Sequence, residues 1–556
     1  MKTIIIGGVA GGASAAARLR RLKENDEIVI LERGDYISFA NCGLPYFIGG
    51  EITDRNMLTL QTPESFRKRF NIDVRIKSEA VKILPESHTV TVRDIETGKE
   101  YEEAFEKLIL SPGAEPIRPN ISGIDYPHVF TLRNIPDTMK IKSFVDNNKP
   151  KKAVVVGGGY IGVEMAENLA DSGIEVSIVE LADHLIASLD ADMAADVHRY
   201  IRSKGIKLFL NNGVTEITDN KIIMQKGSIE TDMVIMSVGV RPETSLANEC
   251  GIKLNSRGSI IVNSNMQTNY PDIYAVGDAI EVNDFVTGTS AFIPLAGPAN
   301  KQGRIAADNI AGIFTEYKGT QGSAILKLFD MTVATTGLNE KRAAAENINY
   351  DKAYVFSASH ASYYPNATNM SVKVLWDKNT RKLLGAQIVG FDGVDKRMDV
   401  FATAIRFGAE VTDLKELELC YAPPFGSAKD PVNMTGFLAE NVINGTVKQF
   451  FWHDVEKLPR DGSVTLLDVR TKTEIARGMI DGFINIPLDT LRDNLDKLPK
   501  DKPVYVHCHS GLRSYIACRI LSGKGYDCYN LAGGWRLYES VINDRTVPEY
   551  ICTECK

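Results

Sequence analysis

The chain has 556 residues, a length that predicts roughly three or four domains, because a single hydrophobic core stops growing near about 250–300 residues. Hydrophobic residues make up 44% and charged residues 24%, as in ordinary globular proteins, and the formal net charge of -7 argues against nucleic-acid binding. The eight irregularly spaced cysteines do not suggest a disulfide framework and indicate a reducing, cytoplasmic setting. No apolar run reaches the roughly 18 residues of a membrane span.

The start of the chain carries a nucleotide-binding signature. A short apolar strand leads into the glycine-rich turn 7–12 and the helix-like run 13–24, and the strand 28–32 ends in Glu32. In such a βαβ unit the glycines let the backbone approach a pyrophosphate, and the acid binds a ribose hydroxyl. Val9 replaces the middle glycine of the GxGxxG pattern, so the flanking strands carry much of this prediction.

The loop with the sequence SFANCGLPY, residues 38–46, holds a lone cysteine, Cys42. The next cysteine along the chain is Cys250, so Cys42 has no CxxC or CxxxxC partner for an internal disulfide. Such a cysteine reacts as a thiolate that attacks sulfur and forms a mixed disulfide. A buried structural cysteine is the alternative, but the flanking Ser, Asn, Gly and Pro are loop residues.

In this position SFANCGLPY resembles the coenzyme A-disulfide reductase branch of the FAD- and NAD(P)H-dependent disulfide reductases. The resemblance covers nearly the whole chain, and it extends to the NADH-dependent persulfide reductase type with a fused rhodanese domain. It implies that the first βαβ unit binds FAD and that two later segments, 108–114 and 268–278, return to the same cofactor. The implied FAD-binding residues are Gly7, Gly11, Gly12, Glu32, Arg33, Ser111, Gly113, Gly277 and Asp278.

A second βαβ unit has an intact GxGxxG pattern, GGGYIG at 157–162, between two apolar strands. Its second strand ends in Glu180, which would bind the adenosine 2′-hydroxyl of NADH and repel the 2′-phosphate of NADPH. How strictly NADH is preferred stays open, and a glycine turn without a nucleotide is the alternative. The predicted NADH-binding residues are Gly157, Gly159, Gly162, Glu180 and Gly239.

From about Gly319 the pattern changes to strands, followed by helical stretches. Strands are predicted at 324–329, 353–357, 371–376 and 383–389, and helical stretches at 395–407 and 411–416. By resemblance this is a dimerisation domain, and the chain is expected to form a homodimer. Tyr363 and Tyr421 lie in aromatic turns, and the resemblance implies that they reach the active site of the other subunit. A tyrosine hydroxyl can protonate a leaving thiolate.

Near the C-terminus, the predicted strand 504–507 leads into the loop CHSGLRS, which begins at Cys508 and precedes a helix. Backbone N–H groups and the helix dipole lower the pKa of a thiol in such a loop and hold an anionic group. With the motifs DVR at 468–470 and NLAGGW at 530–535, the loop resembles a single rhodanese domain. Cys508 would carry a persulfide that Arg513 helps to stabilise, and a phosphatase loop is the alternative. Cys552 and Cys555 form one CxxC pair without a second pair, so no metal site is predicted.

Arg18 and Arg21 are three residues apart and lie on one face of the first predicted helix, which suits the phosphates of coenzyme A. A solvated basic face is the alternative. The resemblance implies further coenzyme A contacts, although Phe70 stands where the family has a lysine. The full set of expected substrate-binding residues is Ser14, Arg18, Arg21, Ser38, Asn41, Arg69, Asn300 and Arg304.

The sequence therefore predicts an α/β fold with two Rossmann-type dinucleotide-binding domains, an α+β dimerisation domain and a C-terminal α/β rhodanese domain. The expected bounds are 1–150 and 244–318 for the FAD domain, 151–243 for the NAD(H) domain, 319–445 for dimerisation, 446–455 for a linker, 456–545 for the rhodanese domain and 546–556 for a tail.

The function that follows is an NADH-dependent reductase of persulfide, polysulfide, coenzyme A persulfide or coenzyme A disulfide. Cys42 would be its redox cysteine, and the sequence does not distinguish among these substrates. Whether Cys508 passes sulfur to Cys42 stays open. An NADH oxidase or peroxidase that cycles through sulfenic acid is the alternative, although Ala10 stands where the peroxidase branch has histidine. A sulfur carrier with a flavin half that is only a scaffold is a third hypothesis.

Overall fold

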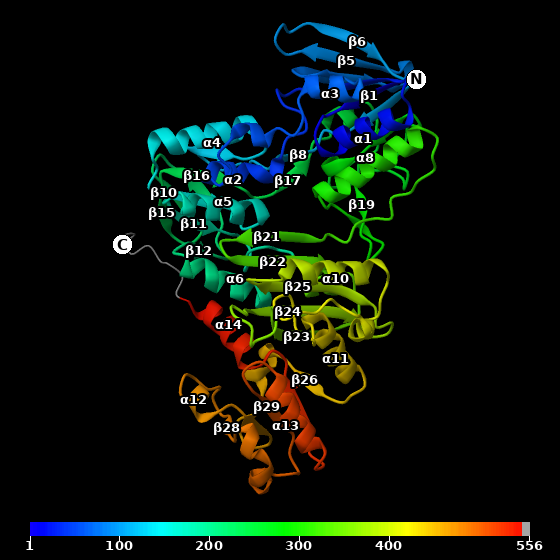
Figure 1. The fold of residues 1–556 in the computed structure, drawn as a ribbon. Coiled ribbons are helices and arrows are strands. Elements are labelled where there is room, and N and C mark those ends of the chain that lie inside the picture. Colours follow the sequence, from blue (N-terminus) through cyan, green and yellow to red (C-terminus); the bar gives the residue numbers. More distant parts are fainter. Residues whose placement is uncertain (548–556) are drawn as a thin grey trace. The chain divides into compact units, whose positions relative to one another are not determined.

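The computed structural model describes residues 1–547, and the chain divides into two compact units. Unit 1 comprises Met1–Ala182 and Gly205–Gly322, and unit 2 comprises Asp183–Lys204 and the described part of 323–550 (Figure 1). Cys552 and Cys555, expected to form a reduced tail pair, lie outside the described residues.

Unit 1 begins with a parallel sheet in the order β18-β7-β1-β2-β3. These strands are β1 (Lys2–Ile6), β2 (Glu27–Leu31), β3 (Asp73–Arg75), β7 (Lys107–Leu110) and β18 (Ile273–Ala275). Helices α1 (Ala10–Leu22) and α8 (Ala296–Ile310) lie side by side (Figure 1). Their approach requires Gly303, because a Cβ there would come within 2.2 Å of the Gly11 carbonyl oxygen. Strands β1, β2 and β7 carry apolar runs, as expected of a parallel sheet that is covered on both faces, whereas the edge strand β3 is mostly polar.

The second parallel sheet of unit 1 has the order β12-β11-β10-β16-β9. Its strands are β9 (Val129–Thr131), β10 (Lys152–Val156), β11 (Glu175–Val179), β12 (Lys207–Phe209) and β16 (Met233–Met236). Helix α5 (Tyr160–Asp171) follows β10, and the short helix α2 (Leu44–Gly49) packs against both α5 and α4 (Ile135–Asn148). The cysteine loop therefore leads directly onto the second dinucleotide unit.

Smaller elements complete unit 1. Two three-stranded antiparallel sheets are formed by β4 (Ser78–Leu84), β5 (Thr89–Asp94) and β6 (Glu100–Ala104), and by β13 (Val214–Ile217), β14 (Lys221–Met224) and β15 (Ser228–Glu230). Two-stranded pairs are β8 (Ala114–Pro116) with β17 (Val240–Pro242) and β19 (Val282–Asn283) with β20 (Ser290–Ala291). The remaining helices are α3 (Pro63–Phe70) and α7 (Ser245–Glu249).

Unit 2 contains an antiparallel sheet in the order β21-β22-β25-β24-β23. The strands are β21 (Ala324–Leu328), β22 (Met331–Gly337), β23 (Tyr350–Ala358), β24 (Asn369–Asp377) and β25 (Leu383–Gly390), with helices α9 (Glu340–Ala345), α10 (Val394–Arg406) and α11 (Pro431–Ile443). Four of these strands match the sequence prediction, and β22 was not predicted. Residues 411–416, predicted to be helical, form a 3-10 helix.

Helix α6 (Ala191–Ser203), which the sequence analysis did not predict, belongs to unit 2. The buried ammonium of Lys373 on β24 lies 2.8 Å from both the Asp190 and the Asp192 carboxylates, and 2.5 Å from that of Glu340. Burial opposes the charge of Lys373, but Asp192 and its other anionic neighbours keep the pKa of this amine well above its usual value. The N-terminal end of α6 is thus tied to the sheet by a buried ionic cluster.

The last part of unit 2 is a parallel sheet in the order β26-β30-β29-β27-β28. Its elements are β26 (Lys448–Phe450), β27 (Thr465–Asp468), β28 (Ile484–Asn485), β29 (Val504–His507), β30 (Cys528–Leu531), α12 (Lys472–Ile475), α13 (Leu512–Ser522) and α14 (Gly534–Thr546). Strand β26 falls within residues 446–455, the segment predicted to be a linker. Its pairing with β30 joins parts of the chain about 80 residues apart, which local sequence patterns do not report.

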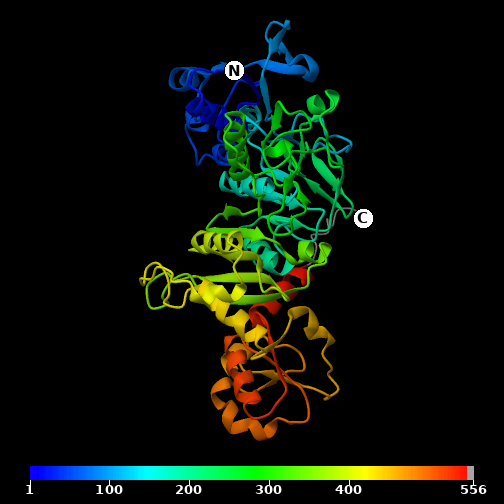
Figure 2. The same ribbon diagram turned by 90° about the vertical axis from the view of Figure 1, so that its right-hand side faces the viewer.

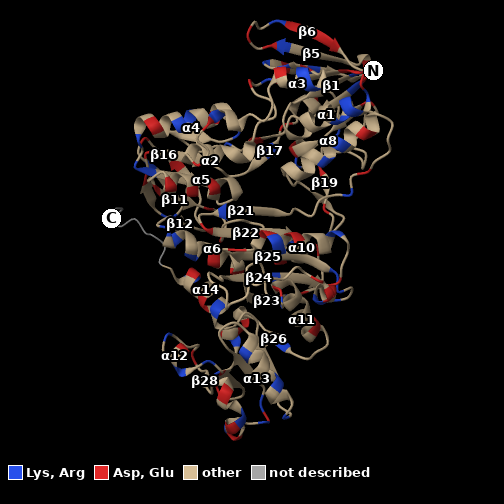
Figure 3. Cartoon of the chain, viewed as in Figure 1, with Lys and Arg blue, Asp and Glu red and all other residues tan. Residues whose placement is uncertain are grey.

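Acidic and basic residues are interspersed along both units (Figure 3). Among the helices that the structure describes, none combines the length and the apolar character that crossing a membrane requires.

Candidate functional site

A cavity of about 530 Å³ lies at the carboxyl ends of the first parallel sheet in unit 1. Gly7 adopts a φ of 96°, and a Cβ there would come within 2.1 Å of the Ser111 carbonyl oxygen. Gly12 does not line the cavity. A Cβ on Gly12 would lie 1.9 Å from the Gly7 carbonyl oxygen, so glycine at this position lets α1 approach β1. The other expected FAD-binding residues line the cavity: Gly7, Gly11, Glu32, Arg33, Ser111, Gly113, Gly277 and Asp278.

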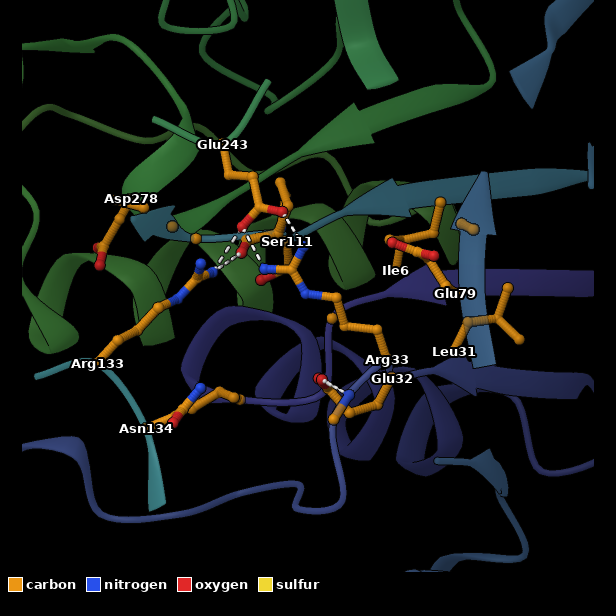
Figure 4. Close-up of a pocket in the computed structure, with 18 of the residues that line it drawn as sticks. Ile6, Leu31, Glu32, Arg33, Glu79, Ser111, Arg133, Asn134, Glu243 and Asp278 are labelled. Atoms are coloured by element: carbon orange, nitrogen blue, oxygen red, sulfur yellow. Dashed lines mark hydrogen bonds and ion pairs between the residues drawn. The ribbon is translucent and has the colours of Figure 1, made fainter. Parts of the chain in front are cut away.

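Two further residues of this cavity were not found by sequence reasoning. The guanidinium groups of Arg33 and Arg133 both point to the Glu243 carboxylate, with distances of 2.8 Å and 2.6 Å (Figure 4). Arg133 also donates to the Pro112 carbonyl oxygen at 3.2 Å. Neither Arg133 nor Glu243 lies in a recognisable motif, because the pair forms between segments 110 residues apart.

The cavity fits FAD. The orphan N–H groups at the start of α1 and the glycine turn suit a pyrophosphate. Burial raises the pKa of the Asp278 carboxyl at the far end, where a ribitol hydroxyl would lie, although Arg133 works in the opposite direction. Asn41, the neighbour of Cys42, lines the same cavity. The cavity therefore runs from the ribose-binding acid to the cysteine loop.

In each βαβ unit, the acid that follows the second strand accepts hydrogen bonds from two backbone N–H groups. Glu32 accepts N–H groups from Gly8 at 3.0 Å and Gly34 at 2.8 Å. Glu180 accepts N–H groups from Gly158 at 2.5 Å and from the backbone two residues on, at 2.7 Å. Each carboxylate thus lies against its own glycine turn, in the place that ribose recognition requires.

The second glycine turn has the geometry of a dinucleotide site. Gly157 has a φ of 106°, and a Cβ there would lie 2.3 Å from the Ser237 carbonyl oxygen. A Cβ on Gly162 would lie 2.0 Å from the Gly157 carbonyl oxygen, whereas one on Gly159 would meet nothing within 4 Å. Gly239 has a φ of 110°. Gly159 therefore leaves open the space that a pyrophosphate would use.

Cys42 lies in a single 3-10 turn, Asn41–Gly43, directly before α2. The residue is exposed. The protein around its sulfur nevertheless raises the pKa of the thiol, first by desolvation and then through the negative charges of Glu164 and Asp278. The described chain by itself therefore favours the neutral thiol, which is not the reactive form.

A second cavity, of about 370 Å³, opens between α1, α8 and the segment around Gln61. Six of the eight expected substrate-binding residues line it: Ser14, Arg18, Arg21, Ser38, Asn300 and Arg304. Asn41 lines the FAD cavity instead, and Arg69 is exposed on α3 and lines neither cavity. Phe66 and Phe70 form an apolar wall.

Asp308 contacts two of the arginines that line this second cavity, and the sequence analysis did not predict this role. Its carboxylate lies 2.6 Å from Nε of Arg18 and 4.0 Å from Nε of Arg304. The hydroxyl of Ser14 donates to the Asn300 side chain at 2.5 Å. Arg18 is thus held by a buried carboxylate, while Arg304 remains 57% exposed.

The two expected aromatic residues of unit 2 meet. The hydroxyls of Tyr363 and Tyr421 are 2.9 Å apart, and both side chains are exposed. Their loops lie next to each other at one end of the antiparallel sheet (Figure 2). The two tyrosines are 58 residues apart in the sequence, so local sequence patterns do not predict this contact, which forms within one chain.

Cys508 lies at the end of β29, with its sulfur 3.1 Å from the Gly511 N–H group and 3.3 Å from the Ser514 hydroxyl. The residue is only 1% exposed. The Arg513 guanidinium pairs with both carboxylate oxygens of Glu474, at 2.8 Å and 2.5 Å, and also interacts with Cys508. The loop therefore presents hydrogen-bond donors to the sulfur.

The start of α14 holds the Cys508 loop in place through two backbone hydrogen bonds. The N–H groups of Trp535 and Arg536 donate to the carbonyl oxygens of Cys508 and His509, each at 2.8 Å. A Cβ on Gly534 would lie 2.7 Å from the Cys508 carbonyl oxygen, so only glycine fits there. The GGW motif is thus a positioning device for the cysteine loop.

Three family models match the chain. The model for pyridine nucleotide-disulphide oxidoreductases matches residues 1–303, the model for the dimerisation domain of the same family matches 323–431, and a rhodanese-like domain matches 452–540. The three matches fall in the order that the sequence predicts.

Characterised and solved relatives resemble the chain over most of its length. Coenzyme A disulfide reductase of Staphylococcus epidermidis is 38% identical over 442 residues, which cover 79% of this chain and 100% of that protein. The structure of reduced Bacillus anthracis CoADR-RHD is 52% identical with a TM-score of 0.96, and 98% of each chain is covered. The NAD-dependent persulfide reductase from A. fulgidus is 34% identical with a TM-score of 0.91, covering 97% of this chain and 100% of that one.

Proposed function

The chain belongs to the pyridine nucleotide-disulphide oxidoreductase family, and on that premise we propose that it is an NADH-dependent flavoprotein that reduces S–S bonds of persulfides, polysulfides or coenzyme A disulfide. The observation that carries the proposal is the lone Cys42, whose neighbour Asn41 lines the cavity suited to FAD. The relatives named coenzyme A disulfide reductase and persulfide reductase support the substrate class.

FAD and NADH are the cofactors. FAD, when bound, accepts two electrons from NADH and passes them to sulfur. Glu32 and the turn at 7–12 would hold the FAD ribose and pyrophosphate, and Glu180 with its own glycine turn would do the same for NADH. Arg33 and Arg133, joined through Glu243, would fix the wall of the FAD cavity.

Cys42 performs the sulfur chemistry in this proposal. Its thiolate attacks the outer sulfur of a persulfide, RS–SH, so that a Cys42–sulfur bond forms, the original S–S bond breaks and RS⁻ leaves. Two electrons from NADH then release the outer sulfur and restore the Cys42 thiolate. The balance is NADH + H⁺ + RSSH → NAD⁺ + RSH + H₂S, so each turnover consumes one proton.

The cavity lined by Arg18, Arg21 and Arg304 would bind the phosphates of a coenzyme A substrate. Three guanidinium groups on two neighbouring helices suit a polyanion, and Phe66 and Phe70 suit an apolar segment. Arg69 and Asn41, expected to contribute, lie outside this cavity: Arg69 is exposed on α3, and Asn41 lines the FAD cavity.

The homodimer and the rhodanese-like domain complete the proposal. The paired hydroxyls of Tyr363 and Tyr421 would enter the partner's active site and protonate the leaving thiolate. Cys508 would accept a sulfane sulfur as a persulfide and supply it to a carrier thiol. The described cysteines are all free thiols, which supports work in the cytoplasm.

Cys42→Ser tests the proposal. The variant should keep FAD, and NADH should still bleach its flavin absorbance, whereas reduction of persulfides and of coenzyme A disulfide should fall by roughly 10³-fold or more. Steady-state rates with each sulfur donor rank the substrates. Near wild-type turnover in Cys42→Ser would overturn the mechanism. Faster consumption of oxygen or peroxide than of any sulfur donor would favour an oxidase.

A further inference from the structure

A third cavity, of about 260 Å³, lies within unit 2 between α6, the start of α14 and one end of the neighbouring strands β24 and β25. Its lining includes the polar and aromatic side chains of Asp196, Arg199, Tyr200, Phe391 and Arg536. Among the described residues that line this cavity, none is one of those expected to bind FAD, NADH or coenzyme A or to carry sulfur. The reductase chemistry therefore leaves this cavity without a role.

The guanidinium of Arg536, on the first turn of α14, has few partners in the protein. Its Nη2 donates to the Ser371 hydroxyl at 3.2 Å, and its carbon lies 4.5 Å from the centre of the Phe356 ring. The Asp196 carboxylate is 3.9 Å from Nη2, which is beyond hydrogen-bond distance. Within residues 1–547, Ser371 is the one acceptor that receives a hydrogen bond from this guanidinium, so most of its five N–H donors have no protein acceptor.

The Asp196 carboxylate is already engaged by other donors. It accepts the hydroxyls of Ser371 at 2.8 Å and Ser540 at 2.9 Å. Nη2 of Arg199, one turn along α6, donates to it at 3.2 Å. Arg199 is 64% exposed, so the cavity opens to solvent on this side. Two arginines and one aspartate among the lining residues leave the cavity with a net charge of +1.

The charge of Arg536 is not fully compensated by the protein. Only 20% of its side chain is exposed, and a largely buried charge is costly unless it is paired and hydrogen-bonded. Burial, assisted by the like charge of Arg199, lowers the pKa of Arg536, and Asp196 offsets only part of this shift. An anion in the cavity would supply the missing acceptors and balance the net charge, and the planar fork of a guanidinium suits an oxyanion.

We propose that this cavity binds a small oxyanion, of the sulfate or phosphate type, between the guanidinium groups of Arg536 and Arg199. Tyr200 and Phe391, whose rings meet edge to face at 5.3 Å, give the site an aromatic wall. The backbone N–H of Arg536 donates to the His509 carbonyl oxygen at 2.8 Å, so this residue contacts both the cavity and the Cys508 loop. The oxyanion site thus adjoins the loop that carries sulfur and uses different side chains. It does not depend on the reductase activity.

The test is hydrogen exchange of the full-length holoenzyme with sulfate, phosphate or thiosulfate, each at about 10 mM and at an ionic strength matched with sodium chloride. A bound anion should slow the exchange of α6 amides between residues 196 and 203, by about tenfold when its concentration is ten times its Kd. The anion that protects at the lowest concentration identifies the ligand. Absence of protection by all three anions would refute the site.

Arg536→Gln and Arg199→Gln should each weaken binding about tenfold or more, because each removes hydrogen bonds to a charged ligand. Since Arg199 is exposed, Arg199→Gln decides the question even if Arg536→Gln does not fold. Arg545→Gln is the matched control: Arg545 is an exposed arginine in the last turn of α14 and does not line the cavity. Protection that persists unchanged in Arg199→Gln and in any folded Arg536→Gln would show that the anion binds elsewhere, and protection lost equally in Arg545→Gln would reduce the effect to overall charge.

Discussion

Nδ1 of His198 lies 2.8 Å from the Asp544 carboxylate, while Nε2 of the same ring accepts the Leu185 N–H group at 3.0 Å. The second contact requires a lone pair on Nε2, so the proton is on Nδ1 and the ring is neutral. The imidazole is completely buried and joins α6 to α14 within unit 2. Arg202 adds an ion pair to the same carboxylate at 2.5 Å.

The first prediction is a loss of stability of unit 2 on acidification. Burial lowers the pKa of His198 below its usual value, although Asp544 opposes this shift. Just below about pH 6.5 the unfolded chain therefore binds more protons at this site than the folded one, and stability falls as pH falls. Thermal unfolding of the α14 region, followed by hydrogen exchange, should show a lower midpoint near about pH 5.5 than near about pH 7.5. In His198→Gln this difference should shrink.

The second prediction concerns Asp544→Ala. Removal of the carboxylate leaves the buried Nδ1–H of His198 without its acceptor, which should cost about 1–3 kcal/mol and speed the exchange of α14 amides. Asn543→Ala is the control, because Asn543 is an exposed neighbour on the same helix. Equal exchange rates in the two variants would show that the buried pair does not hold α14.

The third prediction is that NADH is preferred over NADPH because of Glu180. Its carboxylate is held by two backbone N–H groups, and a 2′-phosphate would meet its charge. Glu180→Ala should reduce the ratio of kcat/KM for NADH to that for NADPH by about tenfold or more. A wild-type enzyme that uses both cofactors equally well would contradict this assignment.

The fourth prediction is that Tyr421→Phe slows sulfur reduction while flavin reduction by NADH stays unchanged. The change removes the hydroxyl that pairs with Tyr363, and general acid catalysis by that hydroxyl would account for roughly 10²-fold in rate. Stopped-flow absorbance separates the two half-reactions. Phe425→Leu, in the same loop and exposed, is the control. An equal effect on both half-reactions would point to loss of the dimer, which sedimentation would detect.

The fifth prediction is that Cys508→Ser separates two routes for sulfur. Small persulfides need only Cys42, so their reduction should survive in the full-length variant. Reduction of sulfur from a bulky donor that cannot itself react with Cys42 should fall steeply, because that route needs a persulfide on Cys508. Cys250→Ser controls for the loss of a thiol elsewhere. Unchanged rates with both donors would show that Cys508 does not feed the reductase.

Local patterns in the sequence predicted the parts of the sites that are local. The glycine turns and the Cys508 loop each lie between a strand and a helix, and Glu32 and Glu180 each directly follow a strand. The pairs Arg133–Glu243 and Arg18–Asp308 join segments more than 100 residues apart, where no spacing rule applies.

The missed elements have similar physical reasons. Strand β22 (Met331–Gly337) follows β21 after a two-residue turn, and its alternation is weak because buried and half-buried positions carry small residues and threonines. Helix α6 begins with the buried acid Asp192, whose charge is balanced by Lys373, 181 residues away in the sequence. Tertiary contacts, rather than local propensity, decide both elements.

The contacts of α6 with α14 also bear on how this chain differs from its shorter relatives. The Staphylococcus protein aligns along its whole length with only part of this chain, whereas here the C-terminal helix supplies the acceptor for His198 and a hydroxyl, from Ser540, for Asp196. Without α14, His198 and Asp196 would lose these hydrogen-bond partners and become exposed. Exchanging the C-terminal domain of this chain for another would therefore require a matching face on α6 as well.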